Sequence, residues 1–396
     1  MLLITVGLSL LVMQSPPDSL TLSAAVHRAL SQRGQVIAAS GVVSRARAEH
    51  RLAGQIPNPS ASYTYTEDPP RQHATVQQSF DWLFRRGLDR GAALASQDAA
   101  RADSAVTVAL VAAETRQAFF RALGSAQSLA LLEEESTIAD SLSGIAHERL
   151  ATGDISELEA DQLALEAARA HQALSRGREE QDAALANLRR TLVWPADRPL
   201  PVLVGHLDAG LDLGDVRALP VAETPSVRGR LADSVSAARR IRGTRVTRIP
   251  IPAFEVGLDW DDPTTPNRQL LVVGFSIPLP LWNLGGGELA VAQANALEAS
   301  GRLAEARSEY VGRAEETRVR MLESARRAKV SRDSLLPAAR RIRERTALAY
   351  RLGETSIIPL LDALRVERET ALSTVEDLLA FQDARATWNS LNGVIE

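Results

Sequence analysis

Arg149-Leu150-Ala151-Thr152-Gly153-Asp154-Ile155-Ser156 returns in altered form two hundred positions later, as Ala349-Tyr350-Arg351-Leu352-Gly353-Glu354-Thr355-Ser356. Each octapeptide carries a glycine in its middle and joins two long stretches rich in Ala, Leu, Arg and Glu. Each pair of stretches follows two short segments in which apolar and polar residues alternate. The sequence therefore predicts one unit present twice: a β-hairpin, a long helix, a tight turn and a returning helix.

The placement of proline limits where the helices can lie. The chain of 396 residues has 19 prolines, none of them in residues 71–194 or 281–336. Because a proline inside a helix costs about 3 kcal/mol, these two intervals favour helix. The prediction is a long helix at 91–147 and another at 288–350, interrupted near Leu336 by Pro337, with returning helices at 156–192 and 356–391.

The starts of the returning helices have capping residues. Ser156 is followed three residues later by Glu159, which is the spacing of a capping box, and Ser356 is expected to cap the second returning helix in the same way. Each long helix with its return is a predicted antiparallel helical hairpin. On the helices alone, a coiled-coil dimer or a spectrin-like rod explains the pattern equally well.

Composition excludes several classes of function. The net charge is −4, so no basic field exists to recruit nucleic acid. The absence of cysteine excludes disulfides, thiolate metal sites, thiol catalysis and a lipid-modified N-terminal cysteine. Only 4% of the residues are aromatic, as expected of long helices that pack through narrow seams. Of the 45 basic residues only Lys329 is a lysine.

The first residues are predicted to be a targeting segment. Residues 1–13 form an apolar run of signal-peptide length, and we assign residues 1–19 to a signal peptide. A buried N-terminal helix or an anchor is the alternative. The run is shorter than the roughly 20 residues that a spanning helix needs.

The short alternating segments are predicted to form two hairpins, at residues 61–83 and 253–277. In the second hairpin one face would carry Phe254, Val256, Leu258 and Trp260, and the other Glu255, Gly257 and Asp259. A transmembrane barrel strand separates lipid from lumen in this way, although a soluble hairpin packed on helices can alternate too. Four strands cannot close a barrel, and open edges are not tolerated in lipid, so membrane insertion would require strands from several chains.

In order and duplicated spacing, these motifs make the chain resemble the TolC-type outer-membrane efflux proteins, from about Leu20 to the end. The proline-rich exit from the last strand is most like the heavy-metal branch of the family, the cobalt-zinc-cadmium type that serves resistance-nodulation-division pumps. One departure is Arg33-Gly34, where the family usually has Asn-Pro. The segments that carry the resemblance are residues 55–59, 86–90, 273–283 with 285–288, and 350–356 with 360–363.

The resemblance implies a mainly helical homotrimer in the outer membrane with a long periplasmic extension. Four strands from each chain would complete a 12-stranded transmembrane β-barrel in the lipid, and the helical hairpins would form a trimeric α-barrel. The chain would be the passive exit duct of a tripartite efflux system, taking substrates, including metal cations, from an inner-membrane pump through a periplasmic adaptor (membrane fusion) protein. The implied organisation is a first repeat at 20–195, a connecting or equatorial segment at 196–224, and a second repeat at 225–396.

The two turns lie at the far ends of the helical hairpins, so we expect them to dock the adaptor. Family resemblance also places a gate beside the second turn. Asp362 matches an acidic gate position, whereas Pro359 stands at the other one. Tyr350 and Glu159 match positions that link the two tips, and a hydrogen bond between them would hold the closed state. The predicted docking residues are Gly153, Asp154, Ile155, Ser156, Gly353, Glu354, Thr355 and Ser356.

Other classes of function have weaker support. Residues 285–290 formally match a G-x-G-x-x-A nucleotide-binding fingerprint, but no alternating β/α pattern follows them. The six histidines form no metal-ligand motif. We therefore expect no catalytic site, no cofactor and no resident metal. The main alternative is a periplasmic coiled-coil adaptor or scaffold without a barrel, although such a protein should have one helical hairpin between split β-rich modules.

Overall fold

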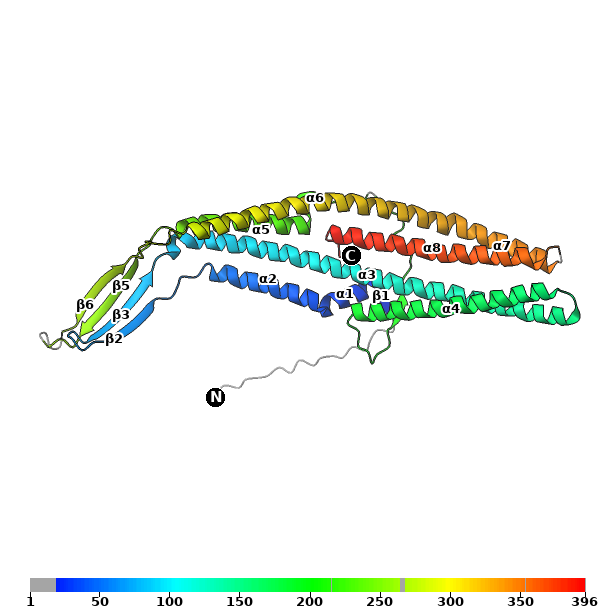
Figure 1. The fold of residues 1–396 in the computed structure, drawn as a ribbon, viewed down its shortest axis with the longest axis horizontal. Helices are drawn as coiled ribbons and strands as arrows, with labels where there is room; N and C mark the ends of the chain where they lie inside the picture. Colours follow the sequence, from blue (N-terminus) through cyan, green and yellow to red (C-terminus); the bar gives the residue numbers. More distant parts are fainter. Residues whose placement is uncertain (1–18, 215, 264–267, 353, 396) are drawn as a thin grey trace, which may run out of the picture.

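The computed structural model describes residues 19–214, 216–263, 268–352 and 354–395. The molecule is long and narrow: helices run along most of its length, a four-stranded sheet lies at one end, and the α3–α4 and α7–α8 turns lie at the other (Figure 1). Residues 1–18 of the predicted signal peptide and the predicted docking residue Gly353 lie outside the described residues. Among the helices of the described ranges, none has the length and apolarity needed to cross a membrane.

The first half of the chain supplies two short helices, a hairpin and a long helical hairpin. In chain order the elements are β1 (Ser19–Thr21), α1 (Leu22–Gln32), α2 (Gly34–Leu52), β2 (Ser60–Tyr65), β3 (Gln72–Ser79), α3 (Trp82–Thr152), α4 (Glu157–Thr191) and β4 (Val202–Val204).

The second half repeats the order of helix, hairpin, long helix and returning helix. Its elements are a 3₁₀ turn (Val221–Glu223), α5 (Pro225–Val246), β5 (Ala253–Trp260), β6 (Leu270–Ser276), α6 (Gly286–Val330), a π-helical segment (Ser331–Leu335), α7 (Leu336–Arg351) and α8 (Ile357–Leu391).

The long helices agree with the prediction except at one start. At 71 residues, α3 is about 105 Å long, and it begins at Trp82 instead of near Gly91. The helix continues through Gly91 because α5 packs there: Arg239 Nη1 donates a hydrogen bond to the Gly91 carbonyl at 2.5 Å. The predicted interruption of the second long helix is confirmed, since the π-helical segment ends immediately before Leu336 and Pro337. The chain also breaks at Arg33, between α1 and α2.

The two hairpins join into one antiparallel sheet with the strand order β2-β3-β5-β6. The joint is between β3 and β5, which pair from Ser79↔Ala253 to Gln72↔Trp260. The first hairpin is shorter than predicted, because β3 ends at Ser79 and the residues after it lead directly into α3. A second, two-stranded sheet was not predicted: β1 pairs in parallel with β4, which attaches the connecting segment to the start of α1.

The main core lies in the middle of the length, where helices from both halves meet. Phe119 of α3 and Phe381 of α8 are fully buried there, and Phe119 packs edge-on against Phe120 with ring centroids 5.8 Å apart. Toward the turns the seams become narrow. A Cβ at Gly124 would lie 2.8 Å from Leu379 Cδ1, and one at Gly177 would lie 2.6 Å from Leu132 Cδ1, so a larger residue would force these leucines to move.

Candidate functional site

One face of the four-stranded sheet is apolar. Because residues paired across strands share a face, the register aligns Val76 of β3, Val256 of β5 and Val273 of β6 in one row. Neighbouring rows contain Phe254 beside Phe275 and Leu258 beside Leu271. All of these apolar side chains are exposed to solvent in the single chain. The predicted residue Trp260 is on this face but half-buried, because it packs 6.2 Å from the ring of Tyr63 on β2.

The opposite face is mostly polar. Ser62 and Thr75 share a 2.6 Å hydrogen bond between β2 and β3. His73 Nδ1 and Asp259 Oδ1 are 2.9 Å apart between β3 and β5. Strand β6 departs from this rule, since Leu270 and Val272 place apolar side chains on the polar face. The predicted separation of Phe254, Val256 and Leu258 from Glu255 and Asp259 is thus seen on β5, whereas β6 has apolar side chains on both faces.

The sheet has two open edges. In the described chain β2 pairs only with β3, and β6 pairs only with β5. Each edge therefore presents backbone N–H and C=O groups that a single chain does not pair. An exposed apolar face combined with two open edges is unfavourable for an isolated soluble domain and suits addition of further strands.

The first turn is a tightly closed helix–helix connection. Gly153 has φ 81°, the left-handed conformation that ends many helices, and the Asp154 N–H donates to the Arg149 carbonyl at 2.9 Å. The predicted capping box is confirmed: Ser156 Oγ accepts from the Glu159 N–H at 3.2 Å, and Glu159 Oε2 accepts from the Ser156 N–H at 3.1 Å. Gly153, Asp154 and Ser156 are exposed, whereas Ile155 is half-buried.

The second turn repeats part of this geometry. The Glu354 N–H donates to the Ala349 carbonyl at 2.9 Å, which is the same bond that closes the first turn. Ser356 takes the N-cap position of α8, but its side chain makes no capping hydrogen bond, so the predicted side-chain cap is wrong. The side chains of Glu354 and Ser356 are exposed, and that of Thr355 is half-buried.

The tip contact between the hairpins differs from the prediction. The predicted hydrogen bond between Tyr350 and Glu159 is not made between these two described residues. Instead, the Tyr350 hydroxyl accepts a 3.2 Å hydrogen bond from Arg149 Nη1, and the guanidinium lies 5.9 Å from the tyrosine ring. The Glu159 carboxylate is already engaged in the capping box. Tyr350 and Glu159 nevertheless line the same small cavity, and apolar contacts through Leu163 and Ile357 hold the tips together.

Asp362 lies on the first turns of α8 and is exposed. In the described residues it makes no hydrogen bond or ion pair, so its carboxylate is available to a partner chain or a cation. Pro359 precedes it on the same helix, so the first turns of α8 carry a single carboxylate. The role of Asp362 in a gate stays a prediction.

An ion-pair network between the two helical hairpins was not predicted. Arg368 of α8 pairs with Glu135 of α3 and lies 3.9 Å from Glu166 of α4, and Arg365 lies 3.4 Å from the same Glu166. These residues line a cavity of about 380 Å³. Burial raises the pKa of Glu135 despite the neighbouring Arg368 guanidinium. The partners are about two hundred residues apart on strongly charged helices, so sequence spacing alone gives no signal for them.

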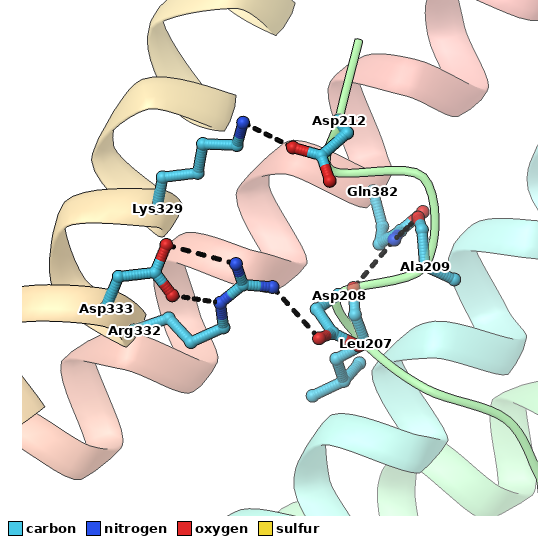
Figure 2. A network of polar contacts seen from close by, with 8 residues as sticks. All are labelled: Leu207, Asp208, Ala209, Asp212, Lys329, Arg332, Asp333 and Gln382. Carbon is cyan, nitrogen blue, oxygen red and sulfur yellow. Dashed lines mark hydrogen bonds and ion pairs between the residues drawn. The ribbon is translucent and has the colours of Figure 1, made fainter.

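The connecting segment crosses the second helical hairpin as a strap, defined here as residues 205–214 (Figure 2). Leu207 and Leu211 are buried in the main core. Gln382 of α8 donates hydrogen bonds to the carbonyls of Leu207 at 2.7 Å and Ala209 at 2.9 Å. These contacts fix the strap against the C-terminal third of α8.

Charged contacts attach the same strap to the end of α6 and to the π-helical segment. Lys329, the single lysine of the sequence, pairs with Asp212, and Arg332 Nη1 lies 3.0 Å from Asp208 (Figure 2). Arg332 also binds Asp333, which lowers the pKa of that carboxyl, and the two carboxylates raise the pKa of Arg332. The strap therefore bridges α8 and the point at which the second long helix changes its winding.

The described residues contain no group of three or more histidine and acidic side chains arranged to hold a metal ion. The histidines that have acidic partners are paired singly: His73 with Asp259, and His171 with Asp140 at 2.8 Å.

The fold is that of the TolC-type outer-membrane channels, which confirms the resemblance seen in the sequence. In sequence, the chain is similar to the cobalt-zinc-cadmium resistance protein CzcC of Cupriavidus metallidurans, with 25% identity over 371 residues that cover 87% of this chain and 83% of CzcC. No family model matches the chain.

Solved structures of membrane proteins superimpose on almost the whole molecule. A membrane protein from Pseudomonas aeruginosa matches with a TM-score of 0.77 and 16% identity, covering 94% of this chain and 90% of that one. CusC matches with a TM-score of 0.75 and 15% identity, covering 94% of this chain and 92% of CusC. The outer membrane protein VceC from Vibrio cholerae matches with a TM-score of 0.74 and 15% identity, covering 95% of this chain and 97% of VceC.

Proposed function

We propose that three copies of this chain form the outer-membrane channel of a tripartite efflux system. The observation that carries the proposal is the sheet: it has an exposed apolar face and two open edges, and it lies at one end of long helical hairpins. Pairing β6 of one copy with β2 of the next would satisfy both edges and complete a 12-stranded barrel. The helical hairpins would continue it as a periplasmic tunnel.

The channel acts as a passive duct and catalyses no reaction. An inner-membrane pump would deliver substrates through a periplasmic adaptor that contacts the two helical tips. The similarity to a cobalt-zinc-cadmium resistance protein supports metal cations as the cargo. The alternative of a periplasmic adaptor or scaffold is not favoured, because it gives no role to a four-stranded sheet with an apolar outer face.

The gate is proposed at the tip end, where Asp362 is exposed near the second turn. Three copies would bring three of these carboxylates around the axis, where they attract cations. Tyr350 contributes through its contact with Arg149, and Glu159 through the capping box that fixes the first tip.

Assembly is the direct test of this proposal. Purified from outer-membrane fractions, the full chain is expected to be a trimer that is stable in mild detergent and dissociates in SDS, because the sheet edges close only between copies. Light scattering coupled to size-exclusion chromatography measures the protein mass within the detergent complex. A monodisperse monomer that stays soluble without detergent would contradict the barrel.

Docking at the tips is tested at Gly153. Replacing Gly153 with Trp is expected to abolish export, measured as metal tolerance of cells that express the complete system, while trimer yield stays near that of the wild type. A Cβ at this position would meet no other atom within 4 Å in the described chain, so a large side chain would start in open space where a partner could dock.

The matched control is Gly153→Ala. It imposes the same cost of about 1–2 kcal/mol for a left-handed backbone but adds almost no bulk. We expect the alanine variant to keep most of its export. If both variants export normally, the tip does not dock the adaptor; if both fail equally, backbone strain explains the loss.

A further inference from the structure

Exposed apolar side chains gather where the strands meet the helices. The start of β2, the end of β3, the start of β5 and the end of β6 are adjacent in the sheet, because Ser60 is opposite Gln77 and Ala253 is opposite both Ser79 and Ser276. All four strand–helix junctions therefore lie at one end of the sheet, and each supplies at least one exposed apolar residue. We call these residues the apolar collar: Ile56, Phe84, Ile249, Leu279, Leu281 and Trp282.

The segment between β6 and α6 gives the collar its largest side chain. Trp282 is 93% exposed, although its surroundings are well fixed. Arg248 Nε donates to the Leu284 carbonyl at 2.8 Å, and Asn283 Oδ1 accepts from the Gly285 N–H at 2.9 Å. An indole held outward by an ordered backbone is typical of a residue that meets a partner surface, and tryptophan is enriched at the membrane–water interface.

Proline reduces the number of backbone donors in the junctions that would need partners there. Three of them contain paired prolines, which have no N–H: Pro57 and Pro59, Pro250 and Pro252, and Pro278 and Pro280. Irregular backbone at the edge of a bilayer is costly when its polar groups are unpaired. Proline at these positions lowers that cost.

A basic surface adjoins the collar on its helical side. From residue 239 to residue 254 the chain contains five arginines and no carboxylate. Arg242 and Arg245, in the last turns of α5, are exposed and make no ion pair in the described chain. Two acidic groups beside this end of α5 already have partners: Asp89, which faces Gly243, lies 3.5 Å from Arg85, and Glu288 accepts from Asn283 at 2.9 Å.

We propose that the apolar collar and the basic end of α5 together bind the anionic phospholipids of the leaflet that faces the periplasm. This inference rests on the proposed function, which places the sheet in the outer membrane and the helices in the periplasm. Trp282, Leu279 and Leu281 occupy the boundary between acyl chains and headgroups. Arg242 and Arg245, one step further from the bilayer centre, bind headgroup phosphates.

The experiment uses the full chain in liposomes that contain equal mole fractions of phosphatidylcholine and phosphatidylglycerol. In one preparation only the phosphatidylglycerol is brominated, and in the other only the phosphatidylcholine. The bromine is on the part of the acyl chain near the headgroup, where it quenches nearby tryptophan fluorescence. The Trp282 signal is the difference between the wild type and Trp282→Phe. We expect stronger quenching of this signal by brominated phosphatidylglycerol than by brominated phosphatidylcholine.

Two double variants, one a test and one a control, show whether the basic surface causes this preference for phosphatidylglycerol. Arg242→Gln with Arg245→Gln is expected to lower the preference by about fivefold for each arginine. The matched control is Arg341→Gln with Arg345→Gln, two exposed arginines of α7 near the opposite end, which should keep the preference. If the first double variant does not insert, the single variant Arg242→Gln carries the same comparison.

Equal quenching of Trp282 by the two lipids, or a preference that survives in the Arg242 and Arg245 variants, would overturn the proposal. Trp260 separates this failure from that of the channel itself, because it lies on the apolar face of the sheet and is measured through Trp260→Phe. If Trp260 is quenched and Trp282 is not, the collar proposal alone is wrong. If neither is quenched, the sheet does not enter the bilayer and the proposed function fails.

Discussion

Arginine in place of Val273 is expected to prevent assembly of the channel in the outer membrane. Val273 lies in the middle of β6 on the apolar face, is 67% exposed, and pairs with Val256 across the sheet. An arginine on the lipid face of a barrel costs about 2–4 kcal/mol at the bilayer midplane, and a trimer would carry three. We expect little or no trimer in outer-membrane fractions, measured by native electrophoresis of detergent extracts.

The neighbouring residue provides a matched control. Val272 has the same side chain on the same strand, but it points to the opposite face, where it pairs with Gly257. Arginine at Val272 would project into a water-filled lumen, so trimer yield is expected to stay near the wild-type level. Equal loss of trimer in both variants would mean that β6 is buried on both faces by protein, and equal yield would show that neither face meets lipid.

The strands could be predicted well from the sequence because side-chain alternation has a period of two, and a shift by one residue would move every apolar side chain to the other face. The pattern in residues 253–260 therefore identifies both the strand and its faces. It does not identify the neighbours. That β3 pairs with β5, joining the two hairpins, depends on contacts nearly two hundred residues apart. The half-burial of Trp260 depends in turn on Tyr63, which reaches it across β3.

Helix positions were predicted about as well as the strands. The error lies at the start of a helix, where a tertiary contact extends it. Proline-free intervals and capping residues are local signals, and they located the returning helices and the break at Pro337. The predicted start of α3 near Gly91 is too late, although glycine weakens a helix by up to about 1 kcal/mol. Packing against α5 compensates there, and Arg239 binds the Gly91 carbonyl. Local propensity cannot reveal such a tertiary contact.

At the tips, the sequence predicted that Tyr350 and Glu159 lie near each other but did not predict the bonds that they form. Tyr350 and Glu159 do meet at the tips, yet Glu159 is held by Ser156 and Tyr350 binds Arg149. The capping box was itself visible in the sequence, and a carboxylate used in it is not free for a second partner. The strap and the ion pairs of Glu135 and Glu166 needed the tertiary structure, because many charged side chains on these helices could have formed equivalent pairs.

Removing the proposed gate carboxylate is expected to have a large effect on block of the channel by cations. Asp362→Ala is expected to relieve block by divalent cations added on the periplasmic side, raising the blocking concentration by about tenfold or more. The physical reason is that Asp362 is exposed and has no partner in the described chain, and that three copies would act on one cation. A tenfold change corresponds to about 1.4 kcal/mol, which is modest for the loss of three nearby charges. Single-channel recording in planar bilayers measures the block.

Asp161→Ala is the matched control for the gate. Asp161 is an exposed carboxylate on the returning helix of the first hairpin, close to the position that corresponds to Asp362 in the second. Its removal changes the net charge of the trimer equally, so general electrostatic attraction of cations falls by the same amount in both variants. We expect block to persist in Asp161→Ala and to weaken only in Asp362→Ala. If wild type and Asp362→Ala are blocked equally, the constriction lies elsewhere; if both variants lose block equally, net charge controls it and Asp362 has no special position.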